Sequence, residues 1–155
     1  MRTIKFRGKC IATEFKDKIV YGSLLTFPDG TARIFEHDHD KVFNYYSVDP
    51  DTICQFTGFQ DKNGKEIYDG DVLRSDTYPF SDIEDNKRDN YFGIIVWNDE
   101  TAMFYIMTIK NPKSSVFGAS EGNSNYLMQE DLQDFEVVGS IHDKKWQKML
   151  NLKSE

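Results

Sequence analysis

Apolar and polar residues alternate along much of this chain, and a period of two is the pattern of a β-strand that buries one face. The pattern is clearest near the start, where Ile4 and Phe6 alternate with the basic residues Lys5, Arg7 and Lys9. It predicts a strand with one apolar face and one basic face.

Two hairpins are predicted from pairs of apolar runs that flank turn-forming residues. The runs at 18–27 and 31–38 meet at a Pro-Asp-Gly turn. The segment 91–109 holds two runs rich in β-branched and aromatic residues around Asn98-Asp99-Glu100-Thr101. A bend is predicted at Asp49-Pro50-Asp51, because proline fixes its own φ and restricts the residue before it.

Helical patterns are scarce. Residues 142–152 carry Trp146, Met149 and Leu150 at helical spacing, with Asp143 as a candidate N-cap. They predict a short C-terminal helix, whose apolar stripe must dock on its own domain or on a neighbour.

Two polar segments, 75–90 and 111–125, lack any period and are predicted to be long loops. Residues 126–134 predict a single helical turn, and residues 135–141 a last short strand. The expected fold class is therefore mainly β, built from antiparallel hairpins.

The stretch TGFQDKNGKEIYDGDVLR, residues 57–74, is the most specific in the chain. Two interpretations compete for it, namely a cation-binding loop and a pair of tight corners. An EF-hand loop counted from Asp61 would need an oxygen ligand where Lys65 stands, a glycine in place of Glu66 and a glutamate in place of Val72. The calcium interpretation therefore fails.

A turn interpretation fits the same residues. Asp61 to Gly64 suit a type I turn in which Gly64 adopts the left-handed conformation as a G1 bulge. That register would place Asp61 opposite Lys65, as a favourable cross-strand pair, and Phe59 near Ile67.

A second corner is predicted at Gly70-Asp71, where a glycine between two apolar pairs indicates positive φ or a close backbone approach. The structural turn residues are then Asp61, Asn63, Gly64, Gly70 and Asp71.

The best metal candidate is Glu36-His37-Asp38-His39-Asp40. On a strand His37 and His39 would share one face, at a spacing that suits Zn²⁺ or Ni²⁺. The remaining histidine, His142, lies in a different segment, and a polar strand end explains the same residues. The pair is a weak candidate, and no cofactor is predicted.

Gly118-Ala119-Ser120-Glu121-Gly122 matches the GxSxG pattern of a nucleophile elbow. That elbow requires a strand-to-helix turn in a parallel sheet, whereas this chain predicts antiparallel hairpins. A loop is the better interpretation, and no catalytic residue is predicted.

The net charge of −7 opposes attraction to phosphate backbones or to anionic membranes. The aromatic residues Phe43, Tyr45 and Tyr46 could stack on bases, although such residues are more often core or interface residues. Two basic strips are candidates for nucleic-acid contact, although solvated faces explain both and are the preferred interpretation. Their members are Lys5, Arg7, Lys9, Lys144, Lys145 and Lys148.

Cellular location is suggested by three sequence features. The two cysteines, Cys10 and Cys54, lie far apart without a CxxC motif, which favours reduced thiols in a cytoplasmic setting. The N-terminal stretch lacks the apolar segment of a signal peptide. No apolar run approaches the about 20 residues that span a bilayer, so no membrane partner is expected.

The segments KFRGK, VYGSL, VDPDTICQFTG, DKNGKEIYDGDVL, GIIVW and VVGSI, in this order, resemble the YopX-like family of bacteriophage and prophage proteins. The resemblance covers most of the chain and omits the loops at 75–90 and 111–125. It implies a mainly β structure whose second half is an SH3-like barrel entered at Gly70-Asp71. It also implies phage or prophage origin and residence in the bacterial cytoplasm, and it brings no activity, cofactor or catalytic residue.

Three parts are expected. They are an N-terminal β region at 1–56, an SH3-like β-barrel at 57–143 with loop insertions at 75–90 and 111–125, and a C-terminal helix or tail at 144–155.

The leading hypothesis is a non-enzymatic accessory protein that binds another protein or a second copy of itself. The alternative is a nucleic-acid-associated factor that uses the basic strips, disfavoured by the acidic charge. A third hypothesis is a small metal-dependent enzyme around His37 and His39.

Overall fold

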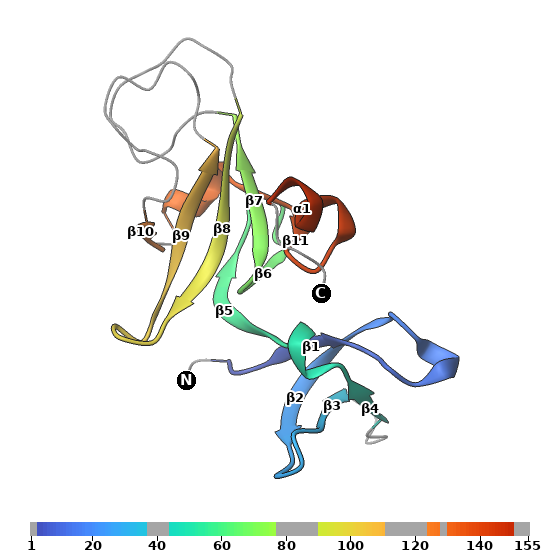
Figure 1. The fold of residues 1–155 in the computed structure, drawn as a ribbon. Coiled ribbons are helices and arrows are strands. Elements are labelled where there is room, and N and C mark those ends of the chain that lie inside the picture. The colour runs from blue at the N-terminus through green and yellow to red at the C-terminus, as the bar shows by residue number, and fades with distance from the viewer. Residues whose placement is uncertain (1–2, 37–43, 77–89, 111–123, 128–129, 151–155) are drawn as a thin grey trace. The chain divides into compact units, whose positions relative to one another are not determined.

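A computed structural model of the chain describes residues 3–36, 44–76, 90–110, 124–127 and 130–150. These residues contain eleven strands, three short 3-10 helices and one α-helix (Figure 1). The predicted fold class, mainly β, is confirmed. The chain divides into two compact units, residues 1–58 and 59–155.

The first unit is an antiparallel sheet in the order β4-β3-β2-β1-β5. Its strands are β1 (Phe6–Lys9), β2 (Ile19–Thr26), β3 (Ala32–Glu36), β4 (Asn44–Val48) and β5 (Cys54–Gln60), of which the last continues into the second unit (Figure 1). Short 3-10 helices lie at Thr13–Phe15 and Pro50–Thr52.

The hairpin predicted around the Pro-Asp-Gly turn is confirmed as β2 and β3. Asp29 organises the turn, because its Oδ1 accepts hydrogen bonds from the backbone N–H of Thr31 at 2.9 Å and from its hydroxyl at 2.7 Å. These bonds favour the ionised carboxylate and lower the pKa of Asp29. Gly30 has a φ of +84°, which glycine adopts without strain.

The predicted bend at Asp49-Pro50-Asp51 is also confirmed. It begins a 3-10 turn in which the Asp49 carboxylate accepts a hydrogen bond from the backbone N–H of Asp51 at 3.1 Å.

One side of this sheet forms the core of the first unit. The buried cluster consists of Cys10, Val20, Ala32, Ile34 and Val48. Both cysteines, Cys10 and Cys54, are buried, and they are not joined in a disulfide.

The end of β1 also reaches β4. Cys10 forms an isolated bridge with Val48, the Ile11 N–H donates to the Ser47 carbonyl at 3.0 Å, and the Asp49 N–H donates to the Lys9 carbonyl at 2.9 Å. The sheet therefore curves around the core cluster.

The second unit contains a sheet in the order β10-β9-β8-β7-β11, and β6 pairs with the end of β5. Its strands are β6 (Glu66–Tyr68), β7 (Asp71–Ser75), β8 (Tyr91–Asn98), β9 (Met103–Lys110), β10 (Ser124–Tyr126) and β11 (Glu136–Ser140). The predicted hairpin of 91–109 is confirmed by the pairing of β8 with β9. The predicted helical turn is confirmed at Asp131–Asp134, and the predicted last strand is confirmed as β11.

The SH3-like barrel expected for this half is not confirmed. A barrel requires its edge strands to pair and close the sheet, whereas β10 and β11 stand at opposite edges in the described residues. The loop predictions are corrected at their ends, because Ser75 belongs to β7 and β10 begins at Ser124. Residues 77–89 and 111–123 lie outside the described part of the chain.

Both faces of this sheet pack against apolar side chains. One face contributes to a cluster that includes Leu73, Ile95 and Ile106. The other carries Val72 and Ile94, which pack with Trp146.

Trp146 belongs to the predicted C-terminal helix, α1 (Lys144–Met149). The predicted stripe is only partly correct, because Trp146 and Leu150 dock on the sheet while Met149 is 55% exposed. Asp143 occupies the N-cap position, but its carboxylate accepts from the Ser140 N–H at 2.9 Å and not from a helix N–H.

None of the helices in the described ranges has the length and apolar character needed to cross a membrane.

Docking of α1 depends on a glycine in β11. A Cβ atom at Gly139 would lie 2.1 Å from Nε1 and 2.5 Å from Cδ1 of Trp146. We predict that Gly139→Ala displaces the indole and destabilises the protein by about 1–3 kcal/mol, the usual cost of overpacking. Thermal unfolding and indole emission, recorded in a Trp97→Phe background so that Trp146 is the sole fluorophore of its kind, measure both effects.

Met149→Ala is the control, since it shortens an exposed side chain of the same helix. An unchanged melting temperature and emission maximum in Gly139→Ala would contradict the close packing of this site.

Candidate functional site

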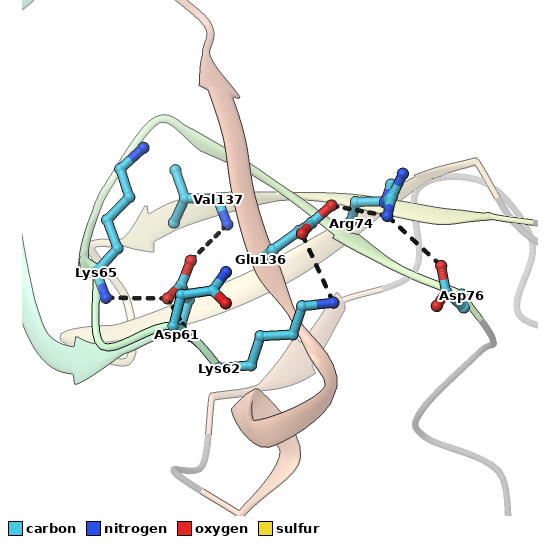
Figure 2. A network of polar contacts seen from close by, with 8 residues as sticks. Asp61, Lys62, Lys65, Arg74, Asp76, Glu136 and Val137 are labelled. Carbon is cyan, nitrogen blue, oxygen red and sulfur yellow. Dashed lines mark hydrogen bonds and ion pairs between the residues drawn. The ribbon is translucent and has the colours of Figure 1, made fainter.

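The corner predicted at Asp61 is built around a buried carboxylate (Figure 2). Its Oδ1 accepts hydrogen bonds from the backbone N–H groups of Asn63 at 2.8 Å and Lys65 at 2.9 Å, and its Oδ2 accepts from the Val137 N–H at 2.9 Å. Gly64 has a φ of +77°, as the G1 bulge requires. Asp61 lies opposite Lys65, as the predicted register requires, because its N–H donates to the Lys65 carbonyl at 2.8 Å. The contact of its carboxylate is with the backbone N–H of Lys65.

Three ion pairs surround this corner, and of their side chains only that of Asp76 is largely exposed (Figure 2). Oε1 of Glu136 on β11 lies 2.8 Å from a guanidinium nitrogen of Arg74 on β7, and Oε2 of Glu136 lies 3.6 Å from Nζ of Lys62. The same guanidinium nitrogen of Arg74 lies 3.6 Å from Oδ1 of Asp76. Pairs this exposed to solvent stabilise by up to about 1 kcal/mol each. Together with Asp61 they fasten the corner to β11 and β7, which is an architectural role.

The second predicted corner is architectural too. Gly70 has a φ of +74°, its N–H donates to the Ile95 carbonyl, and its carbonyl accepts from the Ile141 N–H, both at 2.8 Å. The Asp71 carboxylate, 1% exposed, accepts from the Tyr68 N–H at 2.9 Å.

The candidates for metal or nucleophilic chemistry do not fall in the described structure. His37 and His39 lie outside the described residues, as does the GxSxG segment at 118–122. Within the described ranges, no group of three or more His, Cys, Asp or Glu side chains is arranged to hold a metal ion.

The two basic strips belong to different units. Lys5, Arg7 and Lys9 lie on or beside β1 in the first unit, and Lys144, Lys145 and Lys148 lie on α1 in the second. The strip on α1 is exposed to solvent. Arg7 and Lys9 of the other strip, which lie in β1, belong to a larger surface.

That surface is the side of β1 to β4 opposite the core cluster, and we call it the outer face. Strand pairing brings Arg7 next to Tyr21, Leu25 next to Arg33, and Phe35 next to Tyr45. The complete outer face comprises Arg7, Lys9, Ile19, Tyr21, Ser23, Leu25, Arg33, Phe35, Tyr45 and Ser47.

Large apolar side chains of the outer face are open to solvent. Tyr45 is 57% exposed, Tyr21 46% and Leu25 45%, whereas their strand neighbour Val20 is fully buried in the core. The alternation therefore separates a buried side from a side on which Tyr21, Leu25 and Tyr45 are exposed.

The charged residues of the outer face are Arg7, Lys9 and Arg33, and none of its members is acidic. The guanidinium carbon of Arg33 lies 5.0 Å from the ring centroid of Phe27 and 5.2 Å from that of Tyr45. Cation–π contact of this kind holds a planar cation in place.

The charge of the protein is divided unevenly between the units. Residues 1–58 contain eight basic and eight acidic residues, and residues 59–155 contain eleven basic and eighteen acidic ones. The net charge of −7 therefore belongs to the second unit, and the first unit is neutral.

Sequence reasoning missed most of the outer face. It identified Arg7, Lys9 and Tyr45 separately but not their grouping with Tyr21 and Arg33. The period of two in β2 and β3, combined with the register set by the Pro-Asp-Gly turn, is the signal that would have found it. Of the other aromatic candidates, Tyr46 packs against the core cluster and Phe43 lies outside the described residues.

Comparison with known proteins confirms the family resemblance. The family model described as YopX protein matches residues 5–145, nearly the whole chain, so the chain belongs to the YopX family. No curated protein matches it. Among solved structures it is similar to the crystal structure of protein EF1440 from Enterococcus faecalis, with 18% identity and a TM-score of 0.49, over 97% of this chain and 99% of that one.

The Asp61 corner gives a stability prediction. Asp61→Ala removes the acceptor of three backbone N–H groups, and each unsatisfied donor away from water costs about 1–3 kcal/mol. We expect a loss of at least about 2 kcal/mol in the free energy of unfolding, measured by chemical denaturation.

Asp29→Ala is the matched control, because it removes a turn carboxylate that is fully exposed. Equal unfolding midpoints for the two variants would contradict the role assigned to Asp61.

Proposed function

We propose that this member of the YopX family is a non-enzymatic accessory protein that binds nucleic acid through the outer face of its first unit. The observation that carries the proposal is the composition of that face, which combines three cations with three aromatic rings and no carboxylate. Cations neutralise phosphates and release counterions, and aromatic rings provide surfaces on which bases stack.

The acidic net charge argues less strongly against nucleic acid than the sequence suggested. The excess of acidic residues belongs to residues 59–155. At physiological ionic strength the Debye length is about 8 Å, so exposed charges farther than that from a bound strand are largely screened. The charged side chains of the outer face itself are all cations.

The expected affinity is modest. Three phosphate contacts correspond to a slope of about −2 for the logarithm of the binding constant against the logarithm of salt concentration on a single strand. Such a slope weakens binding roughly 20-fold between about 50 and 200 mM salt.

Protein contact is the second candidate function, favoured by a specific observation. Ile19 and Leu25 on the same face are 37% and 45% exposed, and phosphates offer no apolar partner for them. Interfaces between proteins are enriched in Tyr and Arg, which this face also carries. Its partner would be another protein or a second copy of the chain. We also propose that the protein is of phage or prophage origin and acts in the bacterial cytoplasm.

Binding of nucleic acid to the outer face is tested by fluorescence anisotropy with labelled single-stranded and duplex oligonucleotides of about 20 nucleotides. The wild type should bind one or both with a dissociation constant in the range of about 10⁻⁶ to 10⁻⁴ M at low salt. The triple variant Arg7→Ala/Lys9→Ala/Arg33→Ala should lose most of this binding, because it removes the cations of the outer face.

The control removes the same number of cations from α1, as Lys144→Ala/Lys145→Ala/Lys148→Ala, and should retain binding. Loss of binding in the control alone would move the site to the helix and refute the proposal. Absence of binding, together with a dimer in light scattering that Leu25→Glu dissociates, would establish protein contact instead.

A further inference from the structure

We propose that the ligand of the outer face is single-stranded nucleic acid, with bases stacked on Tyr21 and Tyr45. This inference rests on the proposed function and names the form of nucleic acid that the geometry fits. It is carried by the shape of the face, the placement of its rings and the contact that orders Arg33.

The shape of the face disfavours a duplex groove. The major groove of B-DNA is about 12 Å wide and admits a helix or a two-stranded ribbon. The outer face extends over four strands, β1 to β4, and the end of β1 also hydrogen-bonds to β4, so the sheet curves around its core and the outer face is convex. A convex surface of four strands is broader than a two-stranded ribbon and does not enter a groove, whereas a flexible single strand can follow it.

The aromatic rings come from three neighbouring strands. Tyr21 lies on β2, Phe35 on β3 and Tyr45 on β4, and all three point away from the core. Tyr21 and Tyr45 lie on strands that are separated by β3, so they would engage different bases. Bases are accessible for stacking in a single strand and are closed to it inside a duplex.

The two tyrosines differ from Phe35 in accessibility. Tyr45 is 57% exposed and Tyr21 46%, whereas Phe35 is half-buried and its centroid lies 5.6 Å from that of Tyr45 at an interplanar angle of 36°. Phe35 therefore packs against the Tyr45 ring, and the two tyrosines are the more exposed rings of the face.

Arg33 places a positive charge against an aromatic ring of the face. Its guanidinium lies over both Phe27 and Tyr45, at 5.0 and 5.2 Å from the ring centroids. A cation held against the ring on which a base stacks is placed beside that base's own phosphate. Arg7 is the strand neighbour of Tyr21 on β1 and supplies a second cation beside an aromatic residue.

The test measures anisotropy with oligothymidylate, oligouridylate and a mixed-sequence duplex, each of about 20 nucleotides. We expect single strands to bind at least about tenfold more tightly than the duplex, and Tyr45→Leu and Tyr21→Leu each to weaken single-strand binding about tenfold. The salt slope should stay unchanged in these variants, because the phosphate contacts remain. Comparison of the thymidine and uridine strands distinguishes a DNA ligand from an RNA ligand.

Two controls separate stacking from damage to the fold. Tyr126→Leu removes a tyrosine of similar exposure, 59%, from the second unit and should bind as the wild type does. Tyr45→Phe keeps the ring and should restore binding relative to Tyr45→Leu. Circular dichroism melts establish that each variant is folded.

The outcomes distinguish this inference from the function on which it rests. Equal affinity for duplex and single strands, with no loss in the tyrosine variants, would overturn the inference while leaving phosphate binding by the outer face intact. Absence of binding to all three oligonucleotides would refute the proposed function itself. A dimer dissociated by Tyr45→Leu without any nucleic-acid binding would assign the rings to a protein interface.

Discussion

The core cluster of the first unit lies on one side of β1 to β4, and much of the organisation of these strands follows from that constraint. The cluster includes Val20, Ile34 and Val48. Because side chains alternate across a strand, every second residue is then committed to the opposite side. Residues that hold the fold and residues available for recognition are therefore interleaved, and the latter can vary in chemistry without disturbing the core.

The second unit uses its polar residues differently. Both faces of its sheet are packed, one around Ile95 and the other around Trp146. Its most distinctive sequence, the stretch with Asp61 and Gly70, satisfies backbone groups and fixes two corners instead of presenting chemistry to a ligand. Replacement of a buried carboxylate that accepts three N–H hydrogen bonds would lower the free energy of unfolding, because it leaves the donors without acceptors. A sequence motif can therefore be specific for structural reasons alone.

Local features were predictable from sequence because local chemistry determines them. The Pro-Asp-Gly turn, the bend at Pro50 and the left-handed glycine at Gly64 each depend on residues within a few positions. What the sequence left unresolved was long-range. The partner of Asp61 on β11 is Val137, 76 positions away, and the contact of Arg33 with Tyr45 depends on the pairing of β3 with β4. Whether the second sheet would close into a barrel, and which unit holds the excess acidic charge, likewise required the arrangement of strands.

The central claim is that the outer face of the first unit is a surface for nucleic acid, and backbone amide NMR tests it most directly. On titration of labelled protein with oligothymidylate, we predict chemical-shift changes concentrated in β2, β3 and β4, together with the Nε–H signal of Arg33. The core amides of the second unit should remain unperturbed. Changes confined to the second unit, or a spectrum unaltered at saturating oligonucleotide, would contradict the claim.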